Sequence, residues 1–257
     1  MMKRGLALVL ALCLLPALAL AEAEAEAEAE GEAQQARRAV YLTFDDGPKQ
    51  DTPELLALLD ELDVPATFFL VGMSVKAFPE NTRLILEAGH TIGCHGMNHA
   101  ASMFKESAES ALRELTRFTN TMRELVDPEF STDLFRFPGG STSYGWRTKA
   151  TVRDAGYAWF DWNVMTGDAQ YTFYKDEEML AYTLGQVREQ EVVVLLMHEA
   201  KPRTRRILPE LVAYFRENGY EFRTLSTGAE DREILSRCRF NMMMPEAPGG
   251  EQQAVQE

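Results

Sequence analysis

"VYLTFDDGP" runs from Val40 to Pro48, and it decides how the rest of the chain is interpreted. Val40–Phe44 is an apolar stretch typical of a buried strand, and a glycine and a proline end it after two carboxylates. Adjacent carboxylates repel each other, and a turn needs only one of them. A strand-ending turn explains residues 45–48 taken alone. It does not explain the polar residues that follow other predicted strands, and these bear on the two aspartates.

The rest of the chain alternates short apolar runs with stretches of helical spacing. The predicted strands are Val40–Phe44, Ala66–Val71, Thr91–Cys94, Leu134–Phe137, Tyr157–Trp162, Val192–Met197 and Glu221–Leu225. The predicted helices are Thr52–Leu62, Thr82–Ala88, Glu106–Leu125, Trp146–Ala155, Glu177–Gln190 and Arg206–Asn218. This alternation indicates a mostly parallel sheet, either closed into a barrel or open. The sequence contains neither G-x-G-x-x-G nor a P-loop, which disfavours a nucleotide-binding open sheet.

The first residues have the pattern of an export signal. Lys3 and Arg4 precede an apolar run over Leu6–Leu20, and Ala19-Leu20-Ala21 fits a small-x-small cleavage site. This pattern predicts a secretory signal peptide over residues 1–21. The alternative, a membrane anchor, is disfavoured because a span needs about 20 apolar residues. We therefore expect a secreted, extracytoplasmic protein of the cell-wall space, with no stable membrane anchor after cleavage.

Composition separates a folded middle from two unfolded segments. Residues 22–38 alternate Glu with small residues over most of their length, so they are expected to form an acidic, solvated linker. Residues 240–257 are rich in Pro, Gly and Gln, and they are expected to form a disordered tail. Residues 39–239 remain, and this length suits one domain.

Charge and cysteine content limit the partners. The formal net charge is −14, and it becomes more negative when the signal leaves. Such a charge argues against nucleic acid and anionic lipid as partners. Cys94 and Cys238 remain after cleavage; they could pair in an oxidising compartment, and two free buried thiols fit the sequence equally well. No feature of the sequence indicates an oligomeric state.

Two histidines are four residues apart in "HGMNH". If this segment takes one helical turn, the imidazoles of His95 and His99 face the same way. Together with Asp46 they would supply the three protein ligands that a catalytic zinc site uses. The spacing is common by chance, and two surface histidines on a helix are the alternative. A metal would also explain the acidic pair, because Asp46 would bind the cation and leave Asp45 free as a general base.

Polar residues recur where predicted strands end. "RFPGG" covers residues 136–140, "DWNVMTGDA" covers 161–169, and "LLMHE" covers 195–199. Each follows a predicted parallel strand. Active sites of barrels with parallel strands form at this end, so these segments are expected to meet.

The set resembles the five motifs of the polysaccharide deacetylases, the NodB-homology or carbohydrate esterase family 4. "TFDDGP", "HGMNH", "RFPGG", "DWNVMTGDA" and "LMH" occur in the order of that family, and the resemblance covers about Val40 to Leu225. It implies an α/β fold, namely a distorted (β/α) barrel of about seven mostly parallel strands in a single domain. It also implies a hydrolase that removes N-acetyl or O-acetyl groups from sugars with a divalent metal.

Carried over by position, the resemblance implies a role for each matching residue. The metal ligands are Asp46, His95 and His99; zinc is the expected metal, with cobalt, manganese or nickel as alternatives. The residues implied in catalysis are Asp45 as general base, Arg136 as its partner, Gly139 as a backbone oxyanion donor, His198 as general acid and Asp168 as the residue that orients His198. Leu196 is expected to line the pocket for the acetyl methyl group.

Two positions depart from the family pattern. Gly96 stands where Ser or Thr is usual, so a hydroxyl that supports the histidine loop is missing. Ala169 stands where the family often has Trp, so an aromatic wall of the substrate groove is missing. Trp162 and Tyr144 are candidates to contact sugar instead, and so are Trp146 and Tyr171; packing roles fit each of them as well.

The leading hypothesis is a secreted, metal-dependent hydrolase that removes N-acetyl groups from N-acetylated glycans. Peptidoglycan is the first candidate substrate and chitin oligomers are the second. An alternative is a weak or inactive glycan-binding protein on the same scaffold, motivated by Gly96 and Ala169. A further alternative keeps the enzyme but replaces the substrate with a non-sugar amide or an O-acetyl ester.

Overall fold

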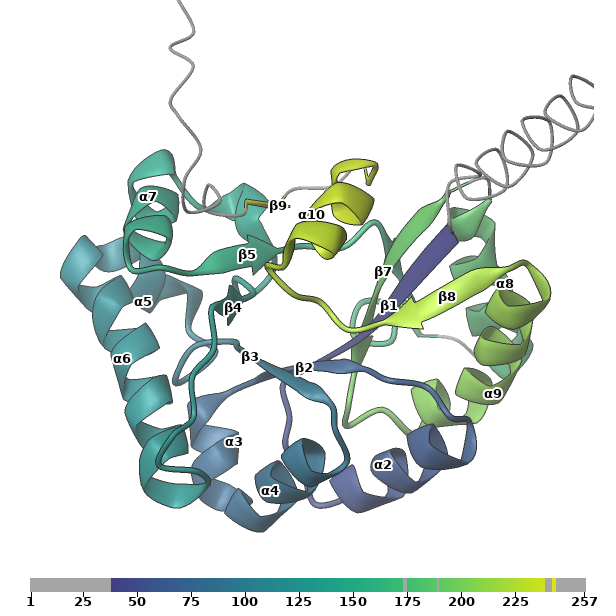
Figure 1. The fold of residues 1–257 in the computed structure, drawn as a ribbon, viewed down its shortest axis with the longest axis horizontal. Helices are drawn as coiled ribbons and strands as arrows, with labels where there is room; N and C mark the ends of the chain where they lie inside the picture. Colours follow the sequence, from purple (N-terminus) through teal and green to yellow (C-terminus); the bar gives the residue numbers. More distant parts are fainter. Residues whose placement is uncertain (1–37, 173–174, 189, 239–241, 244–257) are drawn as a thin grey trace, which may run out of the picture. The chain divides into compact units, whose positions relative to one another are not determined.

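The fold is organised around β1 (Arg38–Asp45), which has a neighbouring strand on each edge (Figure 1). The computed structural model describes residues 38–172, 175–188, 190–238 and 242–243. In it, β1 pairs in parallel with β7 (Val192–His198) over its whole length. The other edge of β1 pairs with β8 (Tyr220–Arg223) first and with β2 (Thr67–Leu70) nearer its end.

The sheet is mostly parallel and curls into an open barrel. Its strand order is β6-β7-β1-β2-β3-β4-β5-β9, with β8 beside β1. The remaining strands are β3 (Thr91–Cys94), β4 (Leu134–Phe135), β5 (Ala158–Phe160), β6 (Val164–Met165) and β9 (Met242–Met243). Every pair among β1 to β8 is parallel, and β9 runs antiparallel to β5. The predicted distorted (β/α) barrel is therefore confirmed.

Helices follow the strands, and all of them except α10 (Ala229–Ser236) lie around the outside of the curled sheet (Figure 1); Ile234 and Leu235 of α10 belong instead to the apolar cluster that contains Tyr41 and Phe69. The other helices are α2 (Thr52–Glu61), α3 (Gly72–Ala77), α4 (Pro79–Glu87), α5 (Ala101–Glu106), α6 (Ala108–Leu125), α7 (Trp146–Asp154), α8 (Asp176–Val187) and α9 (Pro202–Glu217). Among the described residues, none of these helices has the length and apolar character that crossing a membrane would require.

Alternate residues of the central strands pack into two apolar clusters. Val40, Leu42 and Phe44 belong to the cluster that includes the buried faces of the helices, whereas Tyr41 packs with Phe69 in the second cluster. The strand β7 contributes to both clusters, as predicted for an all-apolar strand buried on both faces. Each fully buried side chain of this size contributes roughly 1.5–3 kcal/mol to stability.

Strand register places the predicted motifs at one edge of the sheet. Asp45, the last residue of β1, pairs with His198, the last residue of β7. Asp45 also pairs with Phe69 on β2, and Cys94 at the end of β3 pairs with Phe135 at the end of β4. The segments that follow these strands therefore leave the barrel at the same end.

Several local expectations differ from the structure. The predicted helix over 106–125 is α6, which begins two residues later at Ala108, because Ser107 has extended backbone angles and its hydroxyl caps α6 by accepting a hydrogen bond from the N–H of Ser110. The short elements α3, α5, β6, α10 and β9 were not predicted. Met242–Met243 pair with β5, so the expected disorder does not hold for these two residues. Arg38, the last residue of the predicted linker, is the first residue of β1. The rest of that linker, the rest of the tail and the signal peptide lie outside the described residues.

The cysteines that remain after the predicted cleavage are unpaired. Cys94 is buried in one apolar cluster, and Cys238 packs against the other. Burial raises the pKa of both thiols, that of Cys238 to about 12. The open question is therefore answered in favour of two free thiols that are neutral at physiological pH.

Candidate active site

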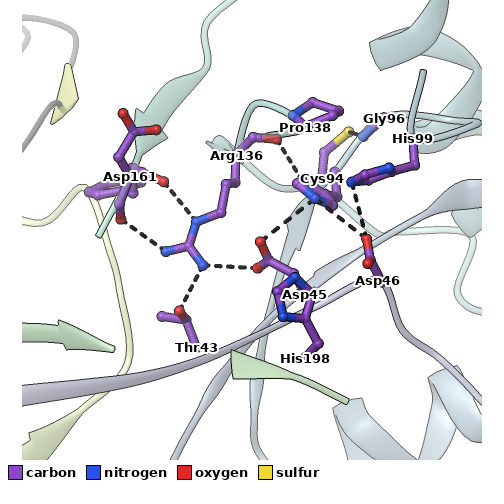
Figure 2. Close-up of polar contacts among 12 residues, drawn as sticks. Thr43, Asp45, Asp46, Cys94, Gly96, His99, Arg136, Pro138, Asp161 and His198 are labelled. Atoms are coloured by element: carbon purple, nitrogen blue, oxygen red, sulfur yellow. Dashed lines mark hydrogen bonds and ion pairs between the residues drawn. The ribbon is translucent and has the colours of Figure 1, made fainter. Parts of the chain in front are cut away.

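The two adjacent aspartates point to different partners because the backbone turns between them. Asp46 has a φ of 71°, which is rare for a residue with a side chain. Asp45 accepts from Arg136 and Asp46 lies beside His99 (Figure 2), while His95 Nε2 lies 3.6 Å from an oxygen of each carboxylate. Strained backbone of this kind clusters at functional sites. The two carboxylates therefore contact two different neighbours, Arg136 and His99, and do more than end the strand in a turn.

Asp46, His95 and His99 form a cluster of potential metal ligands. Asp46 Oδ1 lies 3.6 Å from His95 Nε2 and 3.3 Å from His99 Nε2. Ligand atoms of a tetrahedral zinc ion are about 3.4 Å apart, given metal–ligand bonds of about 2.0–2.2 Å. Asp46 Oδ1 is buried and has no hydrogen-bond partner within the described part of the chain. An unpaired buried carboxylate oxygen beside two imidazole nitrogens fits a divalent cation.

His95 presents a lone pair to this cluster. Its Nδ1 lies 2.8 Å from the carbonyl oxygen of Arg136, and because a carbonyl only accepts, Nδ1 must donate. Nε2 is then the unprotonated nitrogen of the neutral ring. Burial lowers the pKa of His95 more than the nearby carboxylates Asp45 and Asp46 raise it. The imidazole is therefore neutral and held in the tautomer that binds a metal through Nε2.

The predicted helical turn over residues 95–99 is wrong. The segment is a loop in which Gly96 has a φ of 84° and His99 a φ of 54°, and such angles do not occur in a right-handed helix. The two rings nevertheless lie together, with centroids 4.8 Å apart. The left-handed backbone of Gly96 and His99 thus brings the two imidazoles together, as the helical spacing suggested.

Arg136 is fully buried and holds Asp45 in place. Its guanidinium donates to Asp45 Oδ1 at 2.9 Å, to the hydroxyl of Thr43 at 2.7 Å and to the carbonyl oxygen of Asp161 (Figure 2). It also donates to the carbonyl oxygen of Phe160. Each of the three nitrogens of this buried charge thus has at least one acceptor. The other oxygen of Asp45 lies 3.6 Å from His95 Nε2. Arg136 therefore directs the free oxygen of Asp45 to the metal-ligand cluster.

His198 and Asp168 form the second pair that the sequence predicts. His198 Nδ1 lies 2.7 Å from Asp168 Oδ1, and Asp168 Oδ2 accepts from the backbone N–H of His198 and the hydroxyl of Thr204. Burial alone would lower the pKa of His198, but the hydrogen bond and charge of Asp168 outweigh it, so the pKa is raised. The pKa of Asp168 is lowered, although its burial would raise it. A protonated imidazole can therefore persist at neutral pH.

Asp161 holds the loop that contains Gly139. Gly139 and Gly140 both have positive φ, at 76° and 86°, so the loop depends on glycine. The carboxylate of Asp161 accepts hydrogen bonds from the N–H of Ser141 at 2.8 Å and from its hydroxyl at 2.7 Å. Sequence reasoning assigned no role to Asp161 or Thr204, because neither contact follows from sequence spacing. The oxyanion role of Gly139 stays a prediction.

The expected substrate contacts divide into two groups. Leu196 lies two residues before His198, on the same face of β7, and Trp162 is half-buried beside Gly140; both remain predictions. Tyr144 is only 4% exposed, its ring packs on Phe137, and its hydroxyl donates to the carbonyl oxygen of Pro138. Tyr144 therefore packs in the core, and its expected sugar contact does not fit this position.

Glu199 connects the end of β7 to the turn after Asp46. Its Oε1 accepts from the hydroxyl of Thr52 and the N–H of Lys49, and its Oε2 has no partner among the described residues. Burial raises its pKa to about 7. A Cβ at Gly47 would collide with Oε2, which explains the glycine at that position.

Exchanging Glu199 for Gln is expected to remove a pH-dependent loss of stability. Below the usual pKa of 4.5 the carboxyl group is neutral in both the folded and the unfolded chain, so its titration does not change the free energy of unfolding. Between that value and about 7, the unfolded chain releases the proton whereas the folded chain keeps it. This difference lowers the free energy of unfolding of the wild type by about 3 kcal/mol.

Urea unfolding of the metal-free protein at mildly acidic and mildly alkaline pH measures this effect. The free energy of unfolding should fall less with rising pH in the Glu199→Gln variant than in the wild type. Other titrating groups are common to both proteins and cancel in the comparison. An identical pH dependence of the two proteins would contradict a neutral, buried Glu199.

Comparisons with known proteins indicate the family of this chain. The family model described as polysaccharide deacetylase matches residues 32–160. A putative polysaccharide deacetylase, YheN, from Bacillus subtilis is 32% identical over 73% of this chain and 67% of its own length. A peptidoglycan-N-acetylglucosamine deacetylase from Bacillus cereus is 32% identical over 72% of this chain and 68% of its own length.

A solved structure agrees as well. A carbohydrate esterase family 4 esterase from Streptococcus mutans superimposes with a TM-score of 0.68 at 32% identity, covering 74% of this chain and 87% of that one. The matching family model, the similar relatives and the shared barrel lead to one assignment. This chain belongs to the polysaccharide deacetylase family, whose members are hydrolases.

Proposed function

We propose that this protein is a secreted, zinc-dependent hydrolase that removes N-acetyl groups from peptidoglycan. The observation that carries the proposal is the meeting of three groups at one end of the barrel. These are the ligand cluster around Asp46, the Asp45–Arg136 pair and the His198–Asp168 pair. Amide hydrolysis needs an activated water, a stabilised oxyanion and an acid for the leaving amine, and the chain offers a candidate for each.

A divalent cation bound by Asp46, His95 and His99 would acidify water and polarise the acetyl carbonyl. Asp45, held by Arg136, accepts the proton of the attacking water. The backbone N–H of Gly139 donates to the oxygen that becomes negative. His198 delivers its proton to the nitrogen as the C–N bond breaks, so the products are acetate and a free amine. Asp168 keeps His198 protonated and oriented until that step.

Two observations support the glycan and the location. The signal pattern over residues 1–21 would take the chain out of the cytoplasm. Outside the cytoplasm, peptidoglycan is the abundant N-acetylated polymer. The similar Bacillus cereus protein is named as a peptidoglycan-N-acetylglucosamine deacetylase. Chitin oligomers contain the same N-acetyl group and are the second candidate. Leu196 and Trp162 are the side chains proposed to contact the acetyl group and the sugar.

Mass spectrometry of glycans before and after incubation with the protein tests this function. We expect a mass loss corresponding to acetyl groups from peptidoglycan fragments or chitin oligomers, together with free acetate. A strong chelator should abolish the reaction, and added zinc or cobalt should restore it. Activity that survives exhaustive chelation would contradict metal dependence. Saturable glycan binding without acetate release, across metals and pH, would favour an inactive binding protein instead.

A further inference from the structure

Glu114 is a fully buried carboxylate behind the loop that carries His95 and His99. It lies on α6 and takes no part in the chemistry described above. Its Oε2 accepts hydrogen bonds from the backbone N–H groups of Met97 at 2.9 Å and Asn98 at 3.2 Å. Its Oε1 accepts from the side-chain amide of Asn98 at 3.1 Å and lies 3.9 Å from Nη1 of Arg117. Carboxylates are seldom fully buried, so this one calls for an explanation.

The loop needs an acceptor from outside. Because residues 95–99 are not helical, the N–H groups of Met97 and Asn98 have no acceptor from a preceding helical turn. A buried N–H without a partner costs about 1–3 kcal/mol. Glu114 supplies that acceptor, while the start of α3 holds the opposite side through two bonds to the carbonyl oxygens of Gly96 and Met97.

His99 depends on this loop more than His95 does. The ring of His95 is fixed by its hydrogen bond to the carbonyl oxygen of Arg136. The imidazole of His99 is 45% exposed, and within the described part of the chain its one polar contact is with Asp46. Its backbone is also held in a left-handed conformation with a φ of 54°. The position of His99 is therefore set by the residues that precede it, Met97 and Asn98.

Gly96 belongs to the same arrangement. A Cβ at this position would lie 3.0 Å from Phe104 Cε2 and 3.6 Å from Glu114 Oε2, and the φ of 84° would strain any side chain. The space for a Ser or Thr side chain is thus occupied by Phe104 and by the carboxylate of Glu114.

We propose that Glu114 is a positioning residue for the metal centre. By fixing the backbone of Met97 and Asn98, it places His99 Nε2 opposite Asp46 Oδ1. The inference rests on the proposed function, because it presumes that a cation is bound by Asp46, His95 and His99. Loss of such an outer contact typically weakens metal affinity by about 10- to 100-fold.

Zinc affinity, measured by competition with a chromophoric chelator, tests this role without any substrate. The variant Glu114→Met keeps the length of the side chain but removes both acceptors, and its dissociation constant for zinc should rise about 10- to 100-fold. The variant Glu114→Gln keeps one acceptor oxygen for the two N–H groups and should restore most of the affinity. Glu124→Met, at an exposed position on the same helix, is the matched control and should bind zinc like the wild type.

The variants separate positioning from charge. If Glu114→Gln loses as much affinity as Glu114→Met, the negative charge acts and the positioning role is wrong. Wild-type affinity in a folded Glu114→Met variant would also overturn the proposal. Should Glu114→Met fail to fold, Glu114→Asp gives the test, because the shorter side chain keeps the charge but withdraws the acceptor from the two N–H groups. Wild-type zinc affinity in Glu114→Asp would likewise overturn the proposal. Failure of the wild type to bind zinc would instead contradict the metal part of the proposed function.

Discussion

Replacing Asp45 with Asn is expected to lower kcat for acetate release by about 10²- to 10⁴-fold while stoichiometric zinc binding persists. The amide of Asn cannot take a proton from water at neutral pH. The three proposed ligands, Asp46, His95 and His99, are unchanged in this variant, so the cation should still bind. Zinc content and initial rates on an N-acetylglucosamine oligomer, measured on the same preparation, give both quantities.

The substitution also affects stability, so the assay needs a control. Asn leaves the buried guanidinium of Arg136 without its anionic partner, and breaking a buried ion pair costs about 3–5 kcal/mol. Urea unfolding at the assay temperature should therefore establish that the variant is folded there. Thr43→Val is the matched control, because it removes another acceptor of Arg136 Nη1 and keeps both carboxylates. Thr43→Val should lose stability but keep most of its kcat. Wild-type turnover in Asp45→Asn would exclude Asp45 as the base.

The order of the elements and the end of the sheet that carries the site could be predicted from the sequence. Periodicity identified β1 and β7, and their register brings Asp45 and His198 together as the strand-end argument requires. The residues of the ligand cluster also follow from the sequence, because the spacing of His95 and His99 suggested two imidazoles on one side. A loop, however, and not the expected helical turn, places the two imidazoles.

The backbone conformations and supporting contacts of the site could not be predicted. A left-handed Asp46 or His99 has no local sequence signal, because tertiary contacts impose such an angle on a residue that disfavours it. The partners Glu114, Asp161 and Thr204 come from other elements, and hydrogen bonds between distant segments follow no spacing rule. Tyr144 shows the same limit, because aromatic residues near a site look alike in sequence whether they pack or bind.

Replacing Asp168 with Asn is expected to lower kcat by about 10²- to 10⁴-fold and to move the alkaline limb of its pH profile to lower pH. The reaction needs a protonated His198, so this limb follows the pKa of His198 in the complex. In the wild type that pKa is raised, because the hydrogen bond and charge of Asp168, with help from Asp45 and Asp46, outweigh burial. Asn removes the largest raising contribution while burial remains, so the pKa must fall.

The pH profile distinguishes proton transfer from simple loss of structure. Asp168 also accepts a hydrogen bond from Thr204, so Thr204→Val removes one contact of the carboxylate but leaves its charge. This control should keep the alkaline limb near its wild-type position, even if its stability falls. A bound cation would offset the contributions of Asp45 and Asp46 to the pKa of His198, which leaves Asp168 as the partner that matters in the working enzyme. An Asp168→Asn variant with lower kcat but an unshifted alkaline limb would mean that His198 is not the acid.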